Sequence, residues 1–440
     1  MNLSAKQFIV NPSGRLQGTL RVPGDKSISH RAIMLGAIAE GTTQVSGFLE
    51  GEDTLATLAA FKAMGVEIEG PFHDGQVTLH GVGLHGLQAP TVPLYLGNSG
   101  TSMRLLSGLM AGQAFSVEMT GDASLSRRPM RRVTDPLSQM GAKIETTESG
   151  TPPLIIHGGQ RLQAIDYSMP IASAQLKSCL LLAGLYANGT GCVTEPAPTR
   201  DHTERMLAGF GYPIKRQGQR VCLLGGGQLQ ARTIEVPADI SSAAFFMVGA
   251  SITPGSEVLL EHVGINPTRT GIINILQQMG ADISLHNRRD VGGEPVADIQ
   301  VRYQPLHGIE IPQEQVPLAI DEFPIIFIAA ACADGKTVLT GAEELRVKES
   351  DRIQVMADGL QTLGIEAQPT PGGMEIQGGK MHGGTINSQG DHRVAMAFTI
   401  AALSATDPLF IEDCANVATS FPNFIDLAHK AGIDIKMEQR

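Results

Sequence analysis

The feature of this sequence that most constrains its fold is an internal repeat of about 70 residues. Six times, a helical stretch ends in a Gly that is followed by a short β-prone run: Gly65, Gly141, Gly211, Gly280, Gly364 and Gly432. These glycines lie 68 to 84 residues apart. A Gly after the last helical turn is a common left-handed helix stop. The chain is therefore expected to fold as six copies of one supersecondary unit.

A second series of helices alternates with the first, and its members are apolar on nearly every side. They are expected over residues 26–40, 100–112, 173–188, 241–253, 321–334 and 391–406. A helix without a polar face is usually buried. Short β-prone runs such as Thr43–Gly47, Val77–His80 and Val117–Thr120 separate the helices. Each copy should therefore hold two helices and several strands, which predicts an α/β fold.

Six repeats divide naturally into two groups of three. A chain of 440 residues is also too long for one ordinary domain. The last repeat has only one strand-like run after its second helix, Ile433–Met437, and Gln7–Val10 and Leu16–Val22 would supply the missing strands. We therefore expect one domain over 21–239 and a second over 1–20 plus 240–440. The active site is expected in the cleft between the two domains, where ligands often bind.

The composition argues against several classes of protein. With 33 Lys and Arg against 44 Asp and Glu, the net charge is −11, which disfavours a nucleic-acid partner. The longest apolar run, Ile325–Ala333, is too short to span a membrane. The N-terminal residues lack the pattern of a signal or transit peptide. The five cysteines are scattered, so we expect reduced thiols and a cytoplasmic location.

The segment PGDKSISHR opens the first buried helix and places two cations at its start. Lys26 and Arg31 oppose the helix dipole there, whereas an anionic ligand would be favoured by it. Ser27 is available to cap the helix and shares a face with Arg31. An ordinary cap with two solvated cations explains the segment equally simply, because short motifs recur without function.

Other helix starts in the first half also carry candidate binding residues. Asn98 and Gly100 lie in GNSGTSMR, where small residues let the backbone approach a ligand. The segment 127–132 packs four arginines into six residues, and guanidinium groups suit carboxylate and phosphate. Ser173–Gln175 and Thr199–His202 begin two further helices. Capping or a solvated charged face is the alternative interpretation for each segment alone.

The second half contributes a carboxylate and more cations at helix starts. Asp321 precedes an apolar helix and is available as a base, although capping would also explain it. Lys348 and Arg352 share a helix face and repel each other unless an anion lies between them. Asp391–Arg393 begins the last buried helix. If these starts converge on the cleft, they would bind more than one anion, and no His or Cys pattern has metal spacing.

Taken together, these segments resemble the EPSP synthase (3-phosphoshikimate 1-carboxyvinyltransferase) family. VPGDKSISHR, LGNSGTSMR, GDASLSRRPM, ASAQLKS, TRDHTERM, IDEFPI, LRVKESDR and GDHRVAMA occur in order over essentially the whole chain. The resemblance implies a two-domain inside-out α/β barrel of six βαβαββ repeats, the enolpyruvyl transferase fold. It implies transfer of the enolpyruvyl group of phosphoenolpyruvate to the 5-hydroxyl of shikimate 3-phosphate, with release of phosphate. The enzyme is expected to need no cofactor, to be a monomer, and to act in the cytoplasm.

The resemblance also implies roles for individual residues. Asp321 is expected to take the proton of the 5-hydroxyl, Lys348 and Glu349 to share proton transfers at the enol carbon, and Lys26 to contact both substrates. The substrate-binding residues implied are Lys26, Ser27, Arg31, Asn98, Gly100, Arg128, Ser173, Ala174, Gln175, Arg200, Asp321, Lys348, Arg352 and Arg393.

Two positions set this chain apart within the family it resembles. Many members carry a Lys where Thr419 precedes Ser-Phe-Pro here, so one cation at the phosphoenolpyruvate site is missing or replaced. Glyphosate occupies the phosphoenolpyruvate pocket in this family, and members that tolerate it can have Ala at the position of Gly100. This chain keeps Gly, which predicts inhibition by glyphosate in competition with phosphoenolpyruvate.

Two alternative functions belong to different classes. The first is the sister enzyme that acts on UDP-N-acetylglucosamine, which carries a Cys where this chain has Ala123 and lacks the DKSISHR pattern. The second is a non-catalytic anion-binding relative. Such a protein would be expected to have lost Asp321 or Lys348, and both are present.

Overall fold

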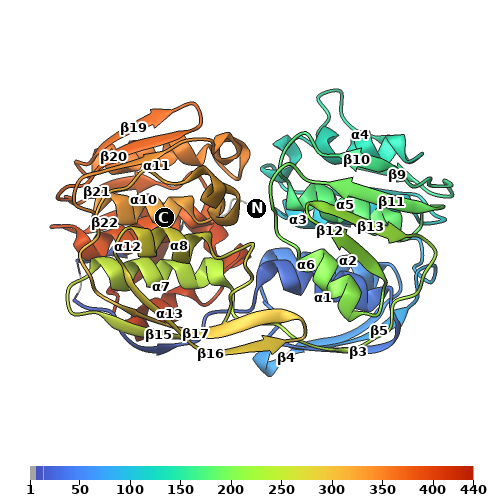
Figure 1. Ribbon diagram of the computed structural model, residues 1–440, viewed down its shortest axis with the longest axis horizontal. Coiled ribbons are helices and arrows are strands. Elements are labelled where there is room, and N and C mark those ends of the chain that lie inside the picture. Colours follow the sequence, from blue (N-terminus) through green and yellow to red (C-terminus); the bar gives the residue numbers. More distant parts are fainter. Residues whose placement is uncertain (1–5, 13, 440) are drawn as a thin grey trace. The chain divides into compact units, whose positions relative to one another are not determined.

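A computed structural model describes residues 6–12 and 14–439 and divides the chain into two compact units (Figure 1). The continuous unit is Gly24–Val236. The discontinuous unit combines the residues up to Pro23 with those from Pro237 onward. The chain thus passes from one unit to the other after Pro23 and again after Val236, close to positions 20 and 240 expected from the repeats.

The continuous unit contains three repeats of two helices with intervening strands. Its elements are α1 (Lys26–Ala37), β3 (Glu40–Ser46), α2 (Glu52–Ala63), β4 (Glu67–Phe72), β5 (Gln76–Val82), β6 (Leu94–Tyr95), α3 (Gly100–Ala111), β7 (Val117–Thr120), α4 (Arg131–Gln139), β8 (Lys143–Glu145), β9 (Leu154–His157), β10 (Asp166–Ser168), α5 (Ala174–Gly184), β11 (Thr190–Thr194), α6 (His202–Gly209), β12 (Ile214–Gln217), β13 (Arg220–Leu224) and β14 (Thr233–Glu235).

The discontinuous unit repeats this alternation. Its elements are β1 (Lys6–Val10), β2 (Gln17–Leu20), α7 (Ile240–Ile252), β15 (Glu257–Gly264), α8 (Gly271–Gln278), β16 (Asp282–Val291), β17 (Glu294–Arg302), α9 (Val316–Ala319), α10 (Phe323–Ala331), β18 (Lys336–Leu339), α11 (Arg352–Thr362), β19 (Glu366–Thr370), β20 (Gly373–Gln377), β21 (Gly384–Asn387), α12 (His392–Ala401), β22 (Leu409–Glu412), α13 (Phe424–Ala431) and β23 (Ile435–Gln439).

Each unit has three small sheets, and all are mixed except the antiparallel sheet β18-β20-β19. In the continuous unit their strand orders are β14-β3-β5-β4, β6-β7-β9-β8 and β10-β11-β13-β12. In the discontinuous unit they are β16-β17-β15-β2, β18-β20-β19 and β21-β22-β1-β23. In every four-stranded sheet one terminal pair is parallel and the other pairs are antiparallel. The repeated sheet pattern matches the repeat read from the sequence.

The second-series helices form the interior of each unit. Helices α7 and α10 are buried along their whole length, and α7, α10 and α12 contact one another. In the continuous unit α3 packs against both α1 and α5. Each unit has its own apolar core, with helices in the middle and strands towards its edges (Figure 1). This arrangement, with helices inside and sheets outside, confirms the predicted fold class.

The glycines of the repeat end six of the other helices as predicted. All six adopt positive φ, between 80° and 100°, within two residues of the ends of α2, α4, α6, α8, α11 and α13: Gly65, Gly141, Gly211, Gly280, Gly364 and Gly432. A residue with a Cβ is strained in this conformation, whereas Gly is not. The helix stops were therefore readable from local sequence alone.

The N-terminal strands join two different sheets. β1 pairs with β22 and β23 and completes the sheet of the sixth repeat, as expected for Gln7–Val10. β2 instead pairs in parallel with β15 of the fourth repeat, so the expectation that Leu16–Val22 completes the sixth repeat was wrong. The sequence shows that these segments are strands, but strand propensity does not specify a partner.

The expectation that all five cysteines are reduced was also wrong. Cys192 and Cys222 lie opposite each other on the antiparallel strands β11 and β13 and form a disulfide. Their separation of 30 residues carries no recognisable spacing, and only the strand register places them together. Cys179, Cys332 and Cys414 are free thiols. The cysteines therefore no longer support the cytoplasmic location inferred from them.

Within the described part of the chain, every helix is too short or too polar to cross a lipid bilayer. The two helices α7 and α10, which are buried along their whole length, are instead core elements of the discontinuous unit. Their uniform hydrophobicity is accounted for by burial among other helices and strands.

Candidate active site

In the discontinuous unit, three carboxylates surround the guanidinium of Arg352. Its Nε donates to Asp391 Oδ2 at 2.8 Å, and its Nη2 donates to Glu349 Oε2 at 2.6 Å. Its Nη1 lies 3.6 Å from Asp321 Oδ1. The side chain is only 1% exposed. The first turn of α11 thus holds a buried cation that links three segments far apart in the sequence.

The charges in this cluster stabilise one another. Burial alone would lower the pKa of Arg352, but Asp391, Glu349 and Asp321 raise it above its usual value. Burial would raise the pKa of Asp391, but the Arg352 guanidinium outweighs that effect and the pKa lies below its usual value. Asp391 also caps α12 by accepting from the Arg393 backbone N–H at 2.9 Å. Both groups are therefore ionised and fixed in position at neutral pH.

Asp321 faces the predicted lysine. Lys348 Nζ lies 3.3 Å from Asp321 Oδ1, and both side chains are partly exposed. Arg393 Nη1 donates to the backbone carbonyl of Asp321 at 2.8 Å and to Glu322 Oε1 at 3.3 Å. The five residues that sequence reasoning selected in this half, Asp321, Lys348, Glu349, Arg352 and Arg393, therefore lie together. Glu322, which is buried and holds Arg393, was missed.

In the continuous unit, Arg31 connects three helices. Its Nε donates to Thr203 Oγ1 at 2.7 Å and its Nη2 to Ser178 Oγ at 2.8 Å. Its Nη1 donates to the backbone carbonyl of Ser27 at 2.9 Å. Helix α1 is capped by Asp25, whose carboxylate accepts from the Ile28 N–H, so the expected cap by Ser27 was wrong. The Ser27 hydroxyl is not needed for capping.

Lys26 forms an ion pair with Asp53 of α2. The Asp53 side chain is 7% exposed, and that of Lys26 is 22% exposed. Sequence reasoning missed Asp53, because a Gly-Glu-Asp segment at a helix start has an ordinary explanation in the helix dipole. The pair fixes the ammonium group of Lys26 at the start of α1.

Asn98 and Arg128 belong to one hydrogen-bonded group. Arg128 Nη2 donates to Asn98 Oδ1 at 2.5 Å, and Asn98 Nδ2 donates to Asp122 Oδ2 at 2.7 Å. Gly100 begins α3 beside them. A Cβ on Gly100 would lie 3.0 Å from Arg128 Nη1 and 3.3 Å from Arg104 Nη1. Gly100 therefore lies against two arginines, and a methyl group there would press on both.

Gln175 is held by the preceding repeat. Arg104 Nη1 donates to Gln175 Oε1 at 2.5 Å, and Gln175 Nε2 donates to Thr101 Oγ1 at 3.1 Å. Ser173 caps α5 by accepting from the Leu176 N–H at 3.3 Å, and Ala174 is the first helical residue. Arg104 was missed, although its place four residues after Gly100 on the same helix face was a usable signal.

Two further positions were singled out from the sequence. Arg200 lies half-buried in the segment between β11 and α6. Thr419, where many relatives are expected to carry Lys, is buried, and its Oγ1 donates to the backbone carbonyl of Asn416 at 2.7 Å. The adjacent Ser420 Oγ lies 3.2 Å from His392 Nε2, next to Arg393. The Thr419 hydroxyl therefore forms a local hydrogen bond within its own turn, and the side chain supplies no positive charge.

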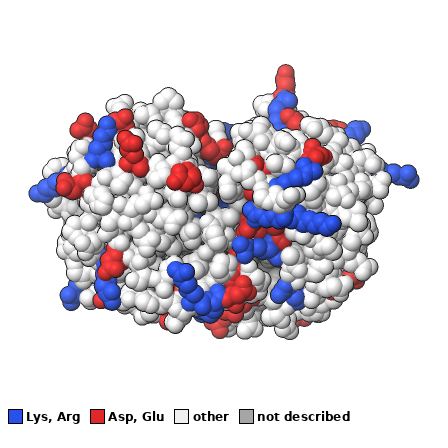
Figure 2. Space-filling view, in the orientation of Figure 1, with Lys and Arg blue, Asp and Glu red and all other residues white. Residues whose placement is uncertain are grey.

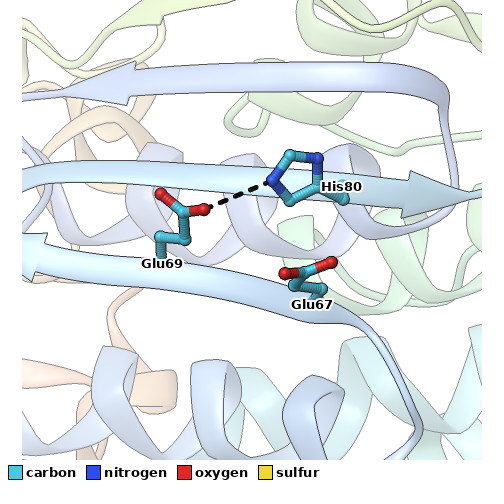
Figure 3. A group of neighbouring side chains, drawn as sticks. All are labelled: Glu67, Glu69 and His80. Carbon is cyan, nitrogen blue, oxygen red and sulfur yellow. Dashed lines mark ion pairs between the residues drawn. The ribbon is translucent and has the colours of Figure 1, made fainter.

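One set of possible metal ligands lies apart from these clusters. Glu67, Glu69 and His80 offer ligand atoms within 4.8 Å of one another, and His80 Nε2 lies 3.7 Å from Glu69 Oε1 (Figure 3). They lie on the paired strands β4 and β5, and both glutamates are exposed. Exposed carboxylates gather on surface strands without a metal, and none of these three residues contacts the groups above.

Charged groups on the surface are mixed in sign. On the face drawn in Figure 2, most of the area carries no charge, and Lys and Arg side chains mostly have Asp or Glu side chains nearby. The clusters around Arg352, Arg128 and Arg31 differ because their cations are largely buried. Guanidinium groups present several donors in a fixed planar geometry, which suits small anions such as phosphate esters and carboxylates.

Comparisons with known proteins agree with this chemistry. The family model described as EPSP synthase (3-phosphoshikimate 1-carboxyvinyltransferase) matches residues 10–427. The 3-phosphoshikimate 1-carboxyvinyltransferase of Methylococcus capsulatus is 70% identical over 98% of both chains. That of Nitrosococcus oceani is 69% identical over 98% of this chain and 96% of its own.

Solved structures are similar over the same extent. EPSP synthase from Acinetobacter baumannii is 61% identical with a TM-score of 0.89, covering 99% of this chain and 100% of its own. The enolpyruvyl transferase NikO from Streptomyces tendae has a TM-score of 0.79 with the same coverage, but it is 17% identical and supports the fold alone.

Proposed function

The chain belongs to the EPSP synthase family, and from that premise we propose which of its residues bind the substrates and which transfer protons. It transfers the enolpyruvyl group of phosphoenolpyruvate to the 5-hydroxyl of shikimate 3-phosphate. The products are 5-enolpyruvylshikimate 3-phosphate and inorganic phosphate, in the shikimate pathway to aromatic amino acids. The roles below rest on the contacts of each residue.

Asp321 is the general base for the 5-hydroxyl. An alcohol is a weak nucleophile until a base takes its proton as the new bond forms. The Asp321 carboxylate is partly exposed and lies 3.3 Å from Lys348 Nζ and 3.6 Å from Arg352 Nη1. Its position is fixed by Arg393, which holds its backbone carbonyl. This carboxylate among three cations is the observation that most directly supports the assignment.

Lys348 and Glu349 carry the proton transfers at the enol carbon. The 5-oxygen bonds to C2 of phosphoenolpyruvate while the methylene carbon gains a proton and becomes a methyl group. The C2–O bond to phosphate then breaks, and the methyl group returns one proton. Two adjacent ionisable residues suit two opposite transfers at one carbon. Glu349 is held by Arg352, and Lys348 by Asp321.

The other candidate residues bind the two anions. Arg128, Arg352 and Arg393, with Asn98 and Gly100, hold phosphoenolpyruvate. Shikimate 3-phosphate is held by a second set: Ser27, Arg31, Ser173, Ala174, Gln175 and Arg200, with Lys26 contacting both substrates. Fixed cations stabilise the charge of the tetrahedral adduct and align the reacting atoms. The phosphoenolpyruvate set combines residues of the continuous unit with Arg352 and Arg393 of the discontinuous unit.

The experiment is a phosphate-release assay with shikimate 3-phosphate and phosphoenolpyruvate. UDP-N-acetylglucosamine replaces shikimate 3-phosphate in the control. Phosphate release from phosphoenolpyruvate with shikimate 3-phosphate, but not with UDP-N-acetylglucosamine, supports the proposal. Release with the UDP-sugar would favour the sister enzyme. An Asp321→Asn variant, which keeps the side-chain shape, should bind shikimate 3-phosphate but release little phosphate. Normal turnover by that variant would contradict the base assignment.

We also propose that the enzyme acts as a monomer in the cytoplasm. All candidate residues come from one chain, so no second copy is needed to complete the site. Both substrates carry phosphate and do not cross a bilayer unaided, so the enzyme must act in the compartment where they are made. Light scattering coupled to size-exclusion chromatography should give a mass near 46.6 kDa. A doubled mass would contradict the monomer.

A further inference from the structure

A fully buried lysine lies two residues beyond Gln175 on α5 and has no part in the proposed chemistry. The Lys177 side chain is 0% exposed. Its Nζ lies 3.0 Å from Glu195 Oε2 and 2.7 Å from Glu204 Oε1, whose side chains are 0% and 5% exposed. One ammonium group in the core thus sits between two carboxylates from different parts of the chain.

Such a network needs a reason beyond stability. Removing three charged groups from water is unfavourable, and apolar side chains of similar size often stabilise a core as well. Arg216 Nη2 lies 3.8 Å from Glu195 Oε1, so a second cation approaches from the surface. What the network provides, and apolar packing would not, is directional contacts at defined atoms.

Those contacts hold Thr199, the residue that precedes Arg200. Glu195 Oε2 accepts hydrogen bonds from the Thr199 backbone N–H at 3.2 Å and from its Oγ1 at 2.6 Å. Lys177 Nζ donates to the Thr199 carbonyl at 3.4 Å. The N–H, hydroxyl and carbonyl of Thr199 are therefore all fixed by the buried network, and the next residue in the chain is Arg200.

The C-terminal end of the segment 199–204 contacts Arg31. Glu204 follows Thr203, whose Oγ1 accepts from Arg31 Nε at 2.7 Å and donates to Ser178 Oγ at 2.7 Å. Ser178 follows Lys177 on α5 and accepts from Arg31 Nη2 at 2.8 Å. Residues 199–204 are therefore held at both ends, by contacts with Lys177, with its partner Glu195 and with the adjacent Ser178.

We propose that Lys177 is a positioning residue for the phosphate of shikimate 3-phosphate. Through Glu195 and Thr199 it sets the place of Arg200, and through Glu204 it sets the place of Thr203, which holds the Arg31 guanidinium. Lys177 itself does not contact the substrate. The inference rests on the proposed function, which assigns Arg31 and Arg200 to that phosphate.

The main test replaces Lys177 by a residue of similar length without charge. Lys177→Met should raise the KM for shikimate 3-phosphate about tenfold or more, because sub-ångström displacement of binding groups is costly. The KM for phosphoenolpyruvate and kcat at saturating shikimate 3-phosphate should change far less. Leu181→Ala, a buried change on the same helix, is the control for general destabilisation and should leave both KM values unchanged. An unchanged KM for shikimate 3-phosphate in Lys177→Met overturns the proposal.

A double variant separates positioning from charge balance. Lys177→Met with Glu204→Gln removes one buried positive and one buried negative charge, so the melting temperature should recover towards that of the wild type. The raised KM for shikimate 3-phosphate should persist, because the contacts to Thr199 and Thr203 are not restored. Recovery of that KM together with the melting temperature would mean that Lys177 only balances charge, and would refute the proposal.

Milder variants cover the case in which Lys177→Met does not fold. Thr199→Val removes the hydroxyl bond to Glu195 and should raise the KM for shikimate 3-phosphate selectively; no change would count against the proposal. Arg31→Ala and Arg200→Ala test the underlying assignment. If both keep a normal KM for shikimate 3-phosphate, the proposed roles fail. If both raise it and Lys177→Met does not, the positioning role alone fails.

Discussion

At the scale of single residues, the properties of the site come from neighbours rather than from residue type. The proposed base, Asp321, has Lys348 and Arg352 beside its carboxylate, and Arg393 holds its backbone carbonyl. Arg352 tolerates burial because Asp391 and Glu349 accept its hydrogen bonds. None of these partners lies within the same short motif as Asp321, so their relation is invisible in the motif itself.

Removing the carboxylate or its lysine should abolish most of the chemistry. Asp321→Ala and Lys348→Ala should each lower kcat by about 10²-fold or more, the usual scale for acid–base groups. The affinity for shikimate 3-phosphate, measured by calorimetry, should survive Asp321→Ala better than Arg31→Ala. Near-normal kcat in Asp321→Ala would show that another group takes the proton.

Gly100 should control sensitivity to glyphosate. A methyl group at this position would lie 3.0 Å from Arg128 Nη1 and 3.3 Å from Arg104 Nη1, so the arginines must shift or the pocket must shrink. One added methyl in a packed site typically costs about 1–3 kcal/mol. The wild type should be inhibited in competition with phosphoenolpyruvate, and Gly100→Ala should weaken inhibition about tenfold or more.

The measurement is the inhibition constant of both proteins at fixed shikimate 3-phosphate. Equal constants would show that Gly100 does not line the pocket. An insensitive wild type would show that another side chain already crowds glyphosate. The KM for phosphoenolpyruvate serves as the internal control, since it should change less than the inhibition constant for the longer ligand.

His30 should make stability depend on pH. Burial, with the charges of Lys26 and Arg31, holds the pKa of His30 well below its usual value, so the folded protein keeps it neutral. In the unfolded chain it binds a proton below about pH 6.5. The free energy of unfolding should therefore fall as pH drops below that value, by up to about 1.4 kcal/mol per pH unit.

Denaturant unfolding of the wild type and of His30→Asn between pH 5 and pH 8 tests this. The Asn amide can replace the ring Nδ1 that lies 2.8 Å from Thr57 Oγ1. The variant should show a shallower pH dependence than the wild type. Parallel curves for the wild type and His30→Asn would contradict the prediction.

At the scale of elements, the repeats differ in how their strands are joined. The sheet that contains β11 and β13 is the one closed by a disulfide, between Cys192 and Cys222. The loop that it closes carries α6 and the segment with Thr199 and Arg200. Helix α5, which carries Ser173 at its cap, packs on the same sheet. The disulfide therefore braces the scaffold of several proposed shikimate 3-phosphate ligands.

Reducing this disulfide should destabilise the continuous unit. Opening a closed loop of 30 residues increases the entropy of the unfolded chain and costs about 3–4 kcal/mol. The oxidised protein should melt several degrees higher than the protein in dithiothreitol when both are followed by calorimetry. Cys222→Ser should melt like the reduced protein in either condition. A melting temperature independent of reductant would mean that the bridge adds no stability in solution.

At the scale of the whole molecule, the two units must cooperate if both bind the same substrates. The chain passes between them twice, after Pro23 and after Val236. Shikimate 3-phosphate would contact residues of both units and would therefore favour the conformation in which they approach. The ligand should lower the radius of gyration measured by small-angle scattering. Arg31→Ala should need more ligand for the same change, and an unchanged radius would mean that the binding conformation is already populated.

What the sequence by itself determined is local. The six helix stops depend on a Gly at one position relative to its own helix, and all six adopt the left-handed conformation. The burial of helices such as α10 follows from apolar residues on every side. The motifs selected Asp321, Lys348, Glu349, Arg352 and Arg393, which the structure brings together.

What only the tertiary structure decided is pairing. Four pairings join residues that lie 18 to more than 200 positions apart in the sequence: β2 with β15, Cys192 with Cys222, Lys26 with Asp53, and Lys177 with Glu195. Strand propensity, a thiol or a charge specifies what a residue can bind but not which residue it meets. That choice depends on strand register and helix packing, which are set by the whole core and not by any short segment.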